Sequence, residues 1–523
     1  MRTHSPYFRL PPVSRRLLAT LFLLHAALGA ALGLSVDEAH YALYAQHLAL
    51  SYFDHPPLVG WIQWPLVALN APDVVLRLIP GALWLATVWL VHGVAQQLQA
   101  AAPAQPGALA ANGAPVVNPA VPLRASAGFW AVLVLLLAPL LHVLGIGLLP
   151  DTLLMFFSVA LMALTLRMTA AQSHPAPWHW LLLGALLGLA GLGKYTAIFS
   201  ALAVVACLLA AHGVKLLRSP WPWVALVLAL LIVSPVAIWN ARNGWISFAY
   251  QAQHGSGDAW QGSNLLRFAL VQMLAFGPLL WWGASGLRRS APGFRMLGLF
   301  FAIPFAVTLA LSGGGSGLPH WTAPAWVALA PFAGLALARP QSAGVRWAVG
   351  TLALLQGVAC VVLVGLMLSG GMPFFSGQSA SAESSNPPNP FADLHGWDAA
   401  GARARQLAQS RSLDSVSVQN WTLASRIGWY ARPLKVHVLQ DRFDQFDLWA
   451  GKLPVGAGTL LVDWSQQPYV TPLGQHGFAR CEWLDTVQVT RLGFTVAHFD
   501  LYACSGWAGD PQPALKPRAV AAP

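Results

Sequence analysis

The feature that most constrains this chain is a succession of apolar runs, each about as long as a bilayer is thick. A helix of roughly 20 apolar residues crosses the hydrocarbon core. About eleven such runs are predicted, at 17–34, 74–98, 126–146, 151–170, 179–193, 196–212, 222–239, 265–286, 296–311, 319–338 and 347–369. Only 9% of the residues are charged, whereas soluble domains carry roughly 25%. The sequence therefore predicts an α-helical polytopic membrane protein.

The basic residues between the runs predict the orientation of the chain. With a cytoplasmic N-terminus and alternating spans, the inside segments hold Arg2, Arg9, Arg15, Arg16, Arg124, Lys215, Arg218, Arg288, Arg289, Arg295, Arg339 and Arg346. The outside loops near the membrane hold Lys194, Arg242 and Arg267. This asymmetry follows the positive-inside rule. Because the basic residues are scattered between apolar runs, the net charge of +11 does not indicate nucleic-acid binding.

The C-terminal part of the chain has a different composition. Residues 373–390, PFFSGQSASAESSNPPNP, read as a linker between a transmembrane domain at 1–372 and a small α/β domain at 391–523. In that domain SVSVQN, LKVHVL, TLLVDW and TVAHFDLYAC are predicted strands, and AAGARARQLAQ is a predicted amphipathic helix. The odd number of preceding spans places the domain outside. A disulfide between Cys481 and Cys504 is plausible there, although their spacing does not prove it.

A polar segment, DEAHYALYAQHLALSYFDHPP, follows the first apolar run at residues 37–57. Ser35 and Glu38 have the spacing of a helix capping box. The predicted topology brings a set of polar residues from distant segments to the outer face, namely Asp37, Asp54, His55, Asp151, Lys194, Arg242 and His254. The sequence therefore predicts a polar site at one surface of the membrane.

Five segments, in order along the chain, resemble the external loops of a known enzyme group. They are DEAHYALYAQHLALSYFDHPPLVGWI, LLPDTLLMFF, GLGKYTAIF, SPVAIWNARNGWISFAYQAQHG and LPHWTAPAW. The sequence is similar to bacterial GT-C glycosyltransferases that use polyprenyl-phosphate sugars. That group includes protein O-mannosyltransferases and the lipid A aminoarabinose transferase.

The resemblance implies a GT-C fold of about eleven membrane helices with a small exported α/β domain. It also implies an integral membrane glycosyltransferase, acting with inversion on the outer face of the bacterial inner membrane. The donor would be a sugar on polyprenyl (undecaprenyl) phosphate, and the acceptor lipid A, another glycolipid or an exported protein. No nucleotide cofactor or nucleic-acid partner is expected. The N-terminus would be cytoplasmic and the C-terminal domain periplasmic.

Such a transfer needs cations or a metal to stabilise the leaving phosphate, and a carboxylate to activate a hydroxyl acceptor. The resemblance implies that Asp37 is the catalytic carboxylate and that Asp151 is a second acidic residue contacting donor or acceptor. Residues expected to bind the donor phosphate or sugar are Glu38, His55, Lys194, Tyr195 and Arg242. Asp54 and His254 are candidate ligands of a divalent metal, as in some relatives. Relatives often have Lys in place of His55, which leaves a direct phosphate role for His55 open.

Each of these residues also has a structural interpretation. Asp37 could simply be part of the N-cap formed by Ser35 and Glu38, and Asp151 near a helix start would complement the helix dipole. Asp54 and His55 precede two prolines, as ordinary turn residues do. Lys194 at the end of a span could extend its amine to the membrane interface, although its outside position calls for a further reason. Arg77 is expected to be structural, pairing with Asp73.

Two other functions remain open on the sequence alone. A transporter or flippase for a lipid-linked glycan would usually place its polar site at the bilayer midplane, between repeated halves. Here the polar residues gather at one face, and no internal repeat is found. A membrane scaffold without catalytic activity would leave the ordered loop motifs unexplained.

Overall fold

The computed structural model describes residues 6–101, 126–170, 175–257, 259–315, 317–374, 389–467 and 473–509. Its contacts divide the chain into two compact units. Unit 1 comprises Met1–Ala26, Asp54–Val59 and Leu78–Cys360, and unit 2 comprises Ala27–Phe53, Gly60–Arg77 and Val361–Pro523. The sequence predicted one domain boundary, at residue 372. The observed division differs from it because two N-terminal segments, Ala27–Phe53 and Gly60–Arg77, group with the C-terminal part. Most of the predicted linker at 373–390 lies outside the described residues.

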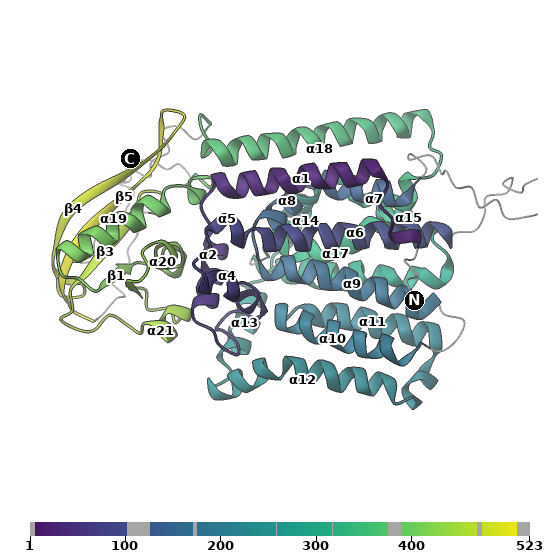
Figure 1. Cartoon of the computed structure of the whole chain (residues 1–523), viewed down its shortest axis with the longest axis horizontal. Coiled ribbons are helices and arrows are strands. Elements are labelled where there is room, and N and C mark those ends of the chain that lie inside the picture. Colours follow the sequence, from purple (N-terminus) through teal and green to yellow (C-terminus); the bar gives the residue numbers. More distant parts are fainter. Residues whose placement is uncertain are drawn as a thin grey trace, which may run out of the picture. The chain divides into compact units, whose positions relative to one another are not determined.

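Unit 1 is helical (Figure 1). Its α-helices are α1 (Pro12–Ala31, as far as Ala26), α6 (Leu78–Ala100), α7 (Ala127–Leu136), α8 (Pro139–Ile146), α9 (Pro150–Ala170), α10 (Pro177–Gly193), α11 (Ala197–His212), α12 (Trp221–Arg242), α13 (Ile246–Ser256), α14 (Gly262–Phe276), α15 (Trp282–Arg289), α16 (Leu299–Ser312), α17 (Ala323–Leu337) and α18 (Ala343–Ser369, as far as Cys360). Short 3-10 segments are η1 (Pro6–Phe8), η3 (Val214–Arg218), η4 (Pro278–Trp281), η5 (Pro292–Gly298) and η6 (Pro319–Thr322).

The helices of unit 1 match the predicted apolar runs, but the count of spans is lower. Among the described residues, 6 helices are long and apolar enough to cross a membrane, or up to 8 if each bent pair counts as one span. The run at 126–146 is broken before Pro139, where α7 and α8 meet at 78°, and the run at 265–286 is broken at Gly277 and Pro278, with a bend of 104°. Proline removes a helical hydrogen bond and clashes with the preceding turn. The predicted number of eleven membrane spans is therefore not confirmed.

The core of unit 1 is organised around α17, every residue of which is buried. It packs against α6, α7 and α9. A Cβ on Gly334 would lie 2.3 Å from the Ala127 carbonyl oxygen, so glycine permits the close approach of α17 to α7. In contrast, α12 and α18 keep large exposed apolar side chains such as Leu231 and Val358. Burial at the centre and apolar exposure on outer helices fit a bundle that is surrounded by lipid.

Unit 2 combines the polar N-terminal segment with an α/β domain. Its helices are α2 (Val36–Gln46), α3 (Leu58–Trp61, from Gly60), α4 (Trp64–Ala68), α5 (Asp73–Leu76), η7 (Ala392–Leu394), α19 (Trp397–Ser410), α20 (Trp421–Tyr430) and α21 (Gln445–Trp449). Its strands are β1 (Ser415–Val418), β2 (Lys435–Val438), β3 (Thr459–Trp464), β4 (Phe478–Arg491) and β5 (Phe494–Trp507), in the order β2-β1-β3-β5-β4. The small α/β domain is confirmed with its predicted strands and helix, and β4 is an additional strand.

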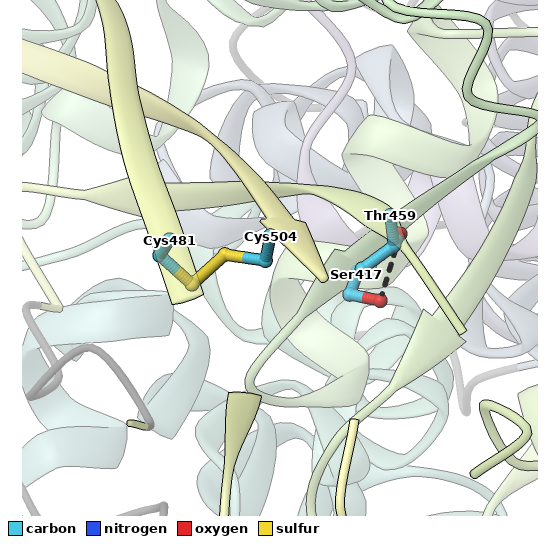
Figure 2. Close-up of a disulfide and its surroundings, with 4 residues drawn as sticks. All are labelled: Ser417, Thr459, Cys481 and Cys504. Carbon is cyan, nitrogen blue, oxygen red and sulfur yellow. Dashed lines mark hydrogen bonds between the residues drawn. A yellow bond between two sulfur atoms is a disulfide. The ribbon is translucent and has the colours of Figure 1, made fainter. Parts of the chain in front are cut away.

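The sheet of unit 2 is mixed. Strands β2, β1 and β3 are parallel, and β3, β5 and β4 are antiparallel. Cys481 of β4 lies opposite Cys504 of β5, and the two form a disulfide (Figure 2). On the neighbouring parallel strands, the Ser417 hydroxyl donates a hydrogen bond of 3.1 Å to the Thr459 hydroxyl. The disulfide that the sequence left open is therefore present, and it joins the two longest strands.

Helix α2 is built as the sequence predicted. The Ser35 side chain accepts from the Glu38 amide, and the Glu38 carboxylate accepts from the Ser35 amide at 3.0 Å. This is the predicted capping box. Within unit 2, α2 packs against α20, where Leu43 lies beside Gly428. The helix that presents Asp37 is thus held both by its own cap and by the α/β domain.

Candidate functional site

In unit 1 the polar residues gather around the start of α9 and the end of α10. The Lys194 amine donates to both carboxylate oxygens of Asp151, at 2.6 and 2.7 Å. Their side chains are 8% and 3% exposed. Asp151 is the second residue of α9, and Lys194 is the C-cap of α10. A buried ion pair of this geometry requires both partners, because either charge alone would be left without compensation.

Aromatic and imidazole side chains surround this pair. His320 Nε2 lies 3.7 Å from Asp151 Oδ2, and the side chain of His320 is 20% exposed. The Lys194 amine also lies 5.9 Å from the centre of the Trp321 ring. His55 is close enough to Asp151 for an electrostatic interaction. We call Asp151, Lys194, His320 and Trp321 the Asp151 cluster, in which His320 is a polar member that reaches solvent.

Other predicted residues of unit 1 have separate contacts. The Tyr195 hydroxyl and the Ser247 hydroxyl are hydrogen-bonded at 2.6 Å. The backbone carbonyl of Asp54 accepts from the side chain of Gln251. His254 stacks on Tyr250, with ring centres 5.3 Å apart, and its ring centre is 5.5 Å from that of Trp321. Arg242, the last residue of α12, is exposed.

A metal site at Asp54 and His254 was an expectation from the resemblance. Within the described ranges, no group of three or more His, Cys, Asp or Glu side chains is arranged to hold a metal ion. The ring of His254 is packed between two aromatic rings. The metal site at Asp54 and His254 therefore stays a prediction from the resemblance, and no reaction step is derived through a metal.

In unit 2 the predicted catalytic carboxylate lies near a buried arginine. Arg426 of α20 is 1% exposed, and its guanidinium lies 3.9 Å from the centre of the Trp397 ring. It forms an ion pair with Asp393. Burial lowers the pKa of Arg426 well below its usual range, and the half-buried carboxylate of Asp37 opposes this shift by favouring the charged guanidinium. Asp37 thus interacts electrostatically with this buried guanidinium.

Glu38, predicted to contact the donor, has both carboxylate oxygens occupied. Arg77 Nε donates to Oε1 at 2.7 Å, and Nη2 donates to Oε2 at 2.8 Å. The expected pair of Arg77 with Asp73 is replaced by this one. Asp73 instead accepts from the Tyr430 hydroxyl at 2.6 Å and from the Trp429 indole at 3.0 Å. The structural role expected for Arg77 stands, but its partner in the sequence-based prediction was wrong.

The structure thus joins Asp151 to Lys194 and places Asp37 near Arg426, and it gives Glu38 a partner in Arg77. Four residues of these arrangements were not selected from the sequence: His320, Trp321, Arg426 and Asp393. His320 lies in the quoted LPHWTAPAW segment, where a histidine beside tryptophan was the available signal. Arg426 and Asp393 lie in the α/β domain, far from Asp37 in the chain; the segment NWTLASRIGWYAR, which contains Arg426, resembles the same enzyme group only weakly.

Asp37 and the Asp151 cluster could contribute to a reaction in different ways. An ionised carboxylate such as Asp37 can accept a proton from a hydroxyl group. In the Asp151 cluster the charge of Lys194 is compensated by Asp151, so the pair is close to neutral. A protonated His320 would add positive charge next to this pair. Asp37 is therefore suited to accept a proton, and the Asp151 cluster with a protonated His320 is suited to bind an anion.

Comparisons with known proteins agree with the resemblance. The family model of the dolichyl-phosphate-mannose-protein mannosyltransferases matches residues 120–239. A search of curated proteins finds no match. The fold is similar to that of ArnT from Cupriavidus metallidurans in the apo state, with 16% identity, a TM-score of 0.53, and coverage of 93% of this chain and 97% of that chain. The structure of ArnT from Cupriavidus metallidurans bound to undecaprenyl phosphate matches with 17% identity, a TM-score of 0.55, and coverage of 94% and 98%. The chain therefore has the fold of ArnT over nearly its whole length, and it is similar to the mannosyltransferase family model over residues 120–239.

Proposed function

We propose that this protein is an integral membrane glycosyltransferase that moves a sugar from a polyprenyl phosphate donor to an acceptor of the bacterial envelope. The observation that carries this proposal is the fold shared with ArnT over nearly the whole of both chains, since one ArnT structure holds undecaprenyl phosphate. The reaction takes place at the outer face of the inner membrane, with the N-terminus cytoplasmic and the α/β domain periplasmic. The positive-inside asymmetry of the loops supports this orientation.

The reaction is a single displacement with inversion. The acceptor oxygen forms a bond to the anomeric carbon, and the bond from that carbon to the phosphate oxygen breaks. A hydroxyl acceptor transfers its proton to Asp37, whereas a phosphate acceptor such as that of lipid A is already an anion and needs little base catalysis. Asp37 is suited to this role because it is a half-buried carboxylate that interacts electrostatically with the Arg426 guanidinium.

The Asp151 cluster contributes to binding the donor. Lys194 is held by Asp151 at 2.6 Å, so its ammonium is fixed in direction rather than free to move. His320 is the more exposed member and supplies a hydrogen-bond donor for a phosphate oxygen. Glu38 acts indirectly, because its pair with Arg77 and its cap of α2 fix the helix that presents Asp37. Tyr195, His55 and Arg242 remain candidates for contacts to the donor.

The test is mass spectrometry of envelope glycolipids and exported glycoproteins from a deletion strain. The strain is complemented with the wild-type gene, with Asp37→Asn, or with Asp398→Asn. Asp398 is a matched control, because it is the second residue of α19 as Asp37 is the second residue of α2. We expect one glycan mass to disappear in the deletion strain and to return with the wild type and Asp398→Asn, but not with Asp37→Asn.

Two outcomes would count against the proposal. Return of the glycan with Asp37→Asn would mean that Asp37 is part of the helix cap or a spectator. An unchanged glycan inventory in the deletion strain, with expression of the gene verified, would remove the transferase function itself. Membrane levels and elution volumes of each variant in detergent show whether a loss of product reflects loss of the folded protein.

A further inference from the structure

The turn of the long β4–β5 hairpin carries an apolar residue that the turn itself does not favour. Arg491 pairs with Phe494, so the connecting loop consists of Leu492 and Gly493. Both loop residues have positive φ, 53° and 82°. Two-residue hairpin loops of this hand favour Asn-Gly or Asp-Gly, because a branched apolar side chain is strained at positive φ. Leu492 is nevertheless 76% exposed. Neither turn geometry nor packing within the protein accounts for a leucine here.

The turn is attached to the end of a membrane-length helix. The C-terminal residues of α18 belong to unit 2, together with the hairpin. His395 Nε2 donates to the Met367 carbonyl in the last turn of α18 at 2.8 Å, and Arg491 Nε donates to His395 Nδ1 at 3.1 Å. A single neutral form of His395, protonated on Nε2, makes both bonds. The residue next to Leu492 is therefore tied to the helix end.

A second contact joins the same two segments. Gly370, directly after α18, lies so close to Val496 of β5 that an added Cβ would meet the Val496 methyl groups at 3.0 Å. A bulge lies at Val496, because Thr490 pairs with Thr495 and Val489 with Ala497. Phe494 pairs with Arg491, which alternation along β4 puts on the face of Val489, so Phe494 lies on the face of the buried Val489 and Ala497. Phe494 is 43% exposed. The face of the hairpin that carries these buried apolar residues thus continues to its tip.

The end of α18 marks the boundary of the bilayer. The helix is long and apolar enough to cross a membrane, and most of it is exposed. Val361, Val362 and Leu368 keep large exposed fractions near its C-terminal end. Phe374, just after the helix, is 78% exposed. Exposed apolar residues thus lie both at the helix end and at the hairpin tip, and lipid would cover the part of the helix that crosses the membrane.

We propose that the hairpin tip, consisting of Leu492, Gly493 and Phe494, inserts into the headgroup and upper acyl region of the bilayer that α18 crosses. Its partner is the lipid surface itself. Apolar side chains gain free energy from burial at that depth, and Arg491 beside them suits anionic headgroups. The contact makes the β4–β5 hairpin a membrane anchor for the α/β domain, in addition to its chain connection through α18.

The test measures the depth of a nitroxide label at the tip in the full-length chain. Cys207 and Cys360 are replaced by alanine, the native disulfide is kept, and Leu492→Cys is labelled. Val455→Cys is the matched control, because Val455 is also 76% exposed. Gly456 beside it donates to the Trp507 carbonyl at 2.7 Å, at the opposite end of the hairpin. A strand of 14 residues puts that end roughly 40 Å from the tip.

In nanodiscs of phosphatidylethanolamine and phosphatidylglycerol, we expect a several-fold higher ratio of oxygen to nickel-complex accessibility at position 492 than at position 455. Equal ratios, with both labels open to the nickel complex, would overturn the proposal. A label at 492 that is immobilised and shielded from both reagents would indicate a protein contact and would overturn it as well.

A second measurement guards against an effect of the label. Leu492→Asn should fold well, because Asn is favoured at this position of the turn. In nanodiscs, hydrogen exchange of the amides at 490–495 should be faster in Leu492→Asn than in the wild type, whereas β1 should be unchanged. Equal protection of the tip in both proteins would contradict lipid insertion.

Discussion

Removal of Lys194 tests the central ion pair of unit 1. Lys194→Met keeps the length of the side chain but leaves the Asp151 carboxylate, which is 3% exposed, without its cation. Opposite charges about 2.7 Å apart attract by about 6 kcal/mol at an effective dielectric constant of about 20. Desolvation offsets much of this attraction. We expect Lys194→Met to lower the free energy of unfolding by about 3–5 kcal/mol, the usual cost of breaking a buried pair.

A double-mutant cycle separates this pair from the rest of the protein. Asp151→Asn, Lys194→Met and the double variant are unfolded at equilibrium by SDS in mixed micelles. The double variant should be more stable than the sum of the single effects predicts, by at least about 2 kcal/mol, because neither charge is then left alone. Lys194→Arg is the control, since it keeps the charge.

The result that would refute this reasoning is additivity. If the two single effects add within about 0.5 kcal/mol, the two charges do not interact in the folded protein. Transfer activity of the double variant gives independent information. A stable double variant without activity would show that the pair serves the reaction, whereas a stable and active one would make it purely structural.

Three further outcomes are expected. Burial raises the pKa of Asp444 to about 6 from 3.8, so its contribution to stability is full below about pH 4 and is lost as pH rises to 6. Asp444→Asn keeps the helix cap, and the difference between its free energy of unfolding and that of the wild type should grow by about 3 kcal/mol across that range. Parallel pH profiles of the two proteins would contradict this prediction. Removing the Cys481–Cys504 bond, which links residues 23 apart in the chain, should lower the free energy of unfolding by about 3 kcal/mol. The measurement compares the unfolding transitions of the wild type and the double alanine variant, and an unchanged transition would argue against the bond. Arg426→Gln should reduce glycosyl transfer, because Asp37 loses the guanidinium with which it interacts. Unchanged transfer by the folded variant would show that Arg426 does not support Asp37.

The local features of this protein were predictable from the sequence. The apolar runs located the helices of unit 1, because a segment in lipid must satisfy its own backbone hydrogen bonds and expose apolar side chains. Ser35 and Glu38 predicted the cap of α2, since both partners lie within one turn. Alternating β-branched residues predicted four of the five strands of unit 2. Each of these features depends on neighbours within a few residues.

The partners of the site residues were decided by the tertiary structure. Whether Arg77 pairs with Asp73 or with Glu38 depends on how α2 packs, and Glu38 is 39 residues away along the chain. Likewise, the resemblance suggested both Asp151 and Lys194 but not that they bind each other, and no pattern linked Asp37 with Arg426 of the α/β domain. Charge type and approximate depth can be read from a sequence, because they follow from composition. The pairing of charges depends on distances of a few ångströms between segments that are remote in the chain, and only the packing of the fold sets those distances.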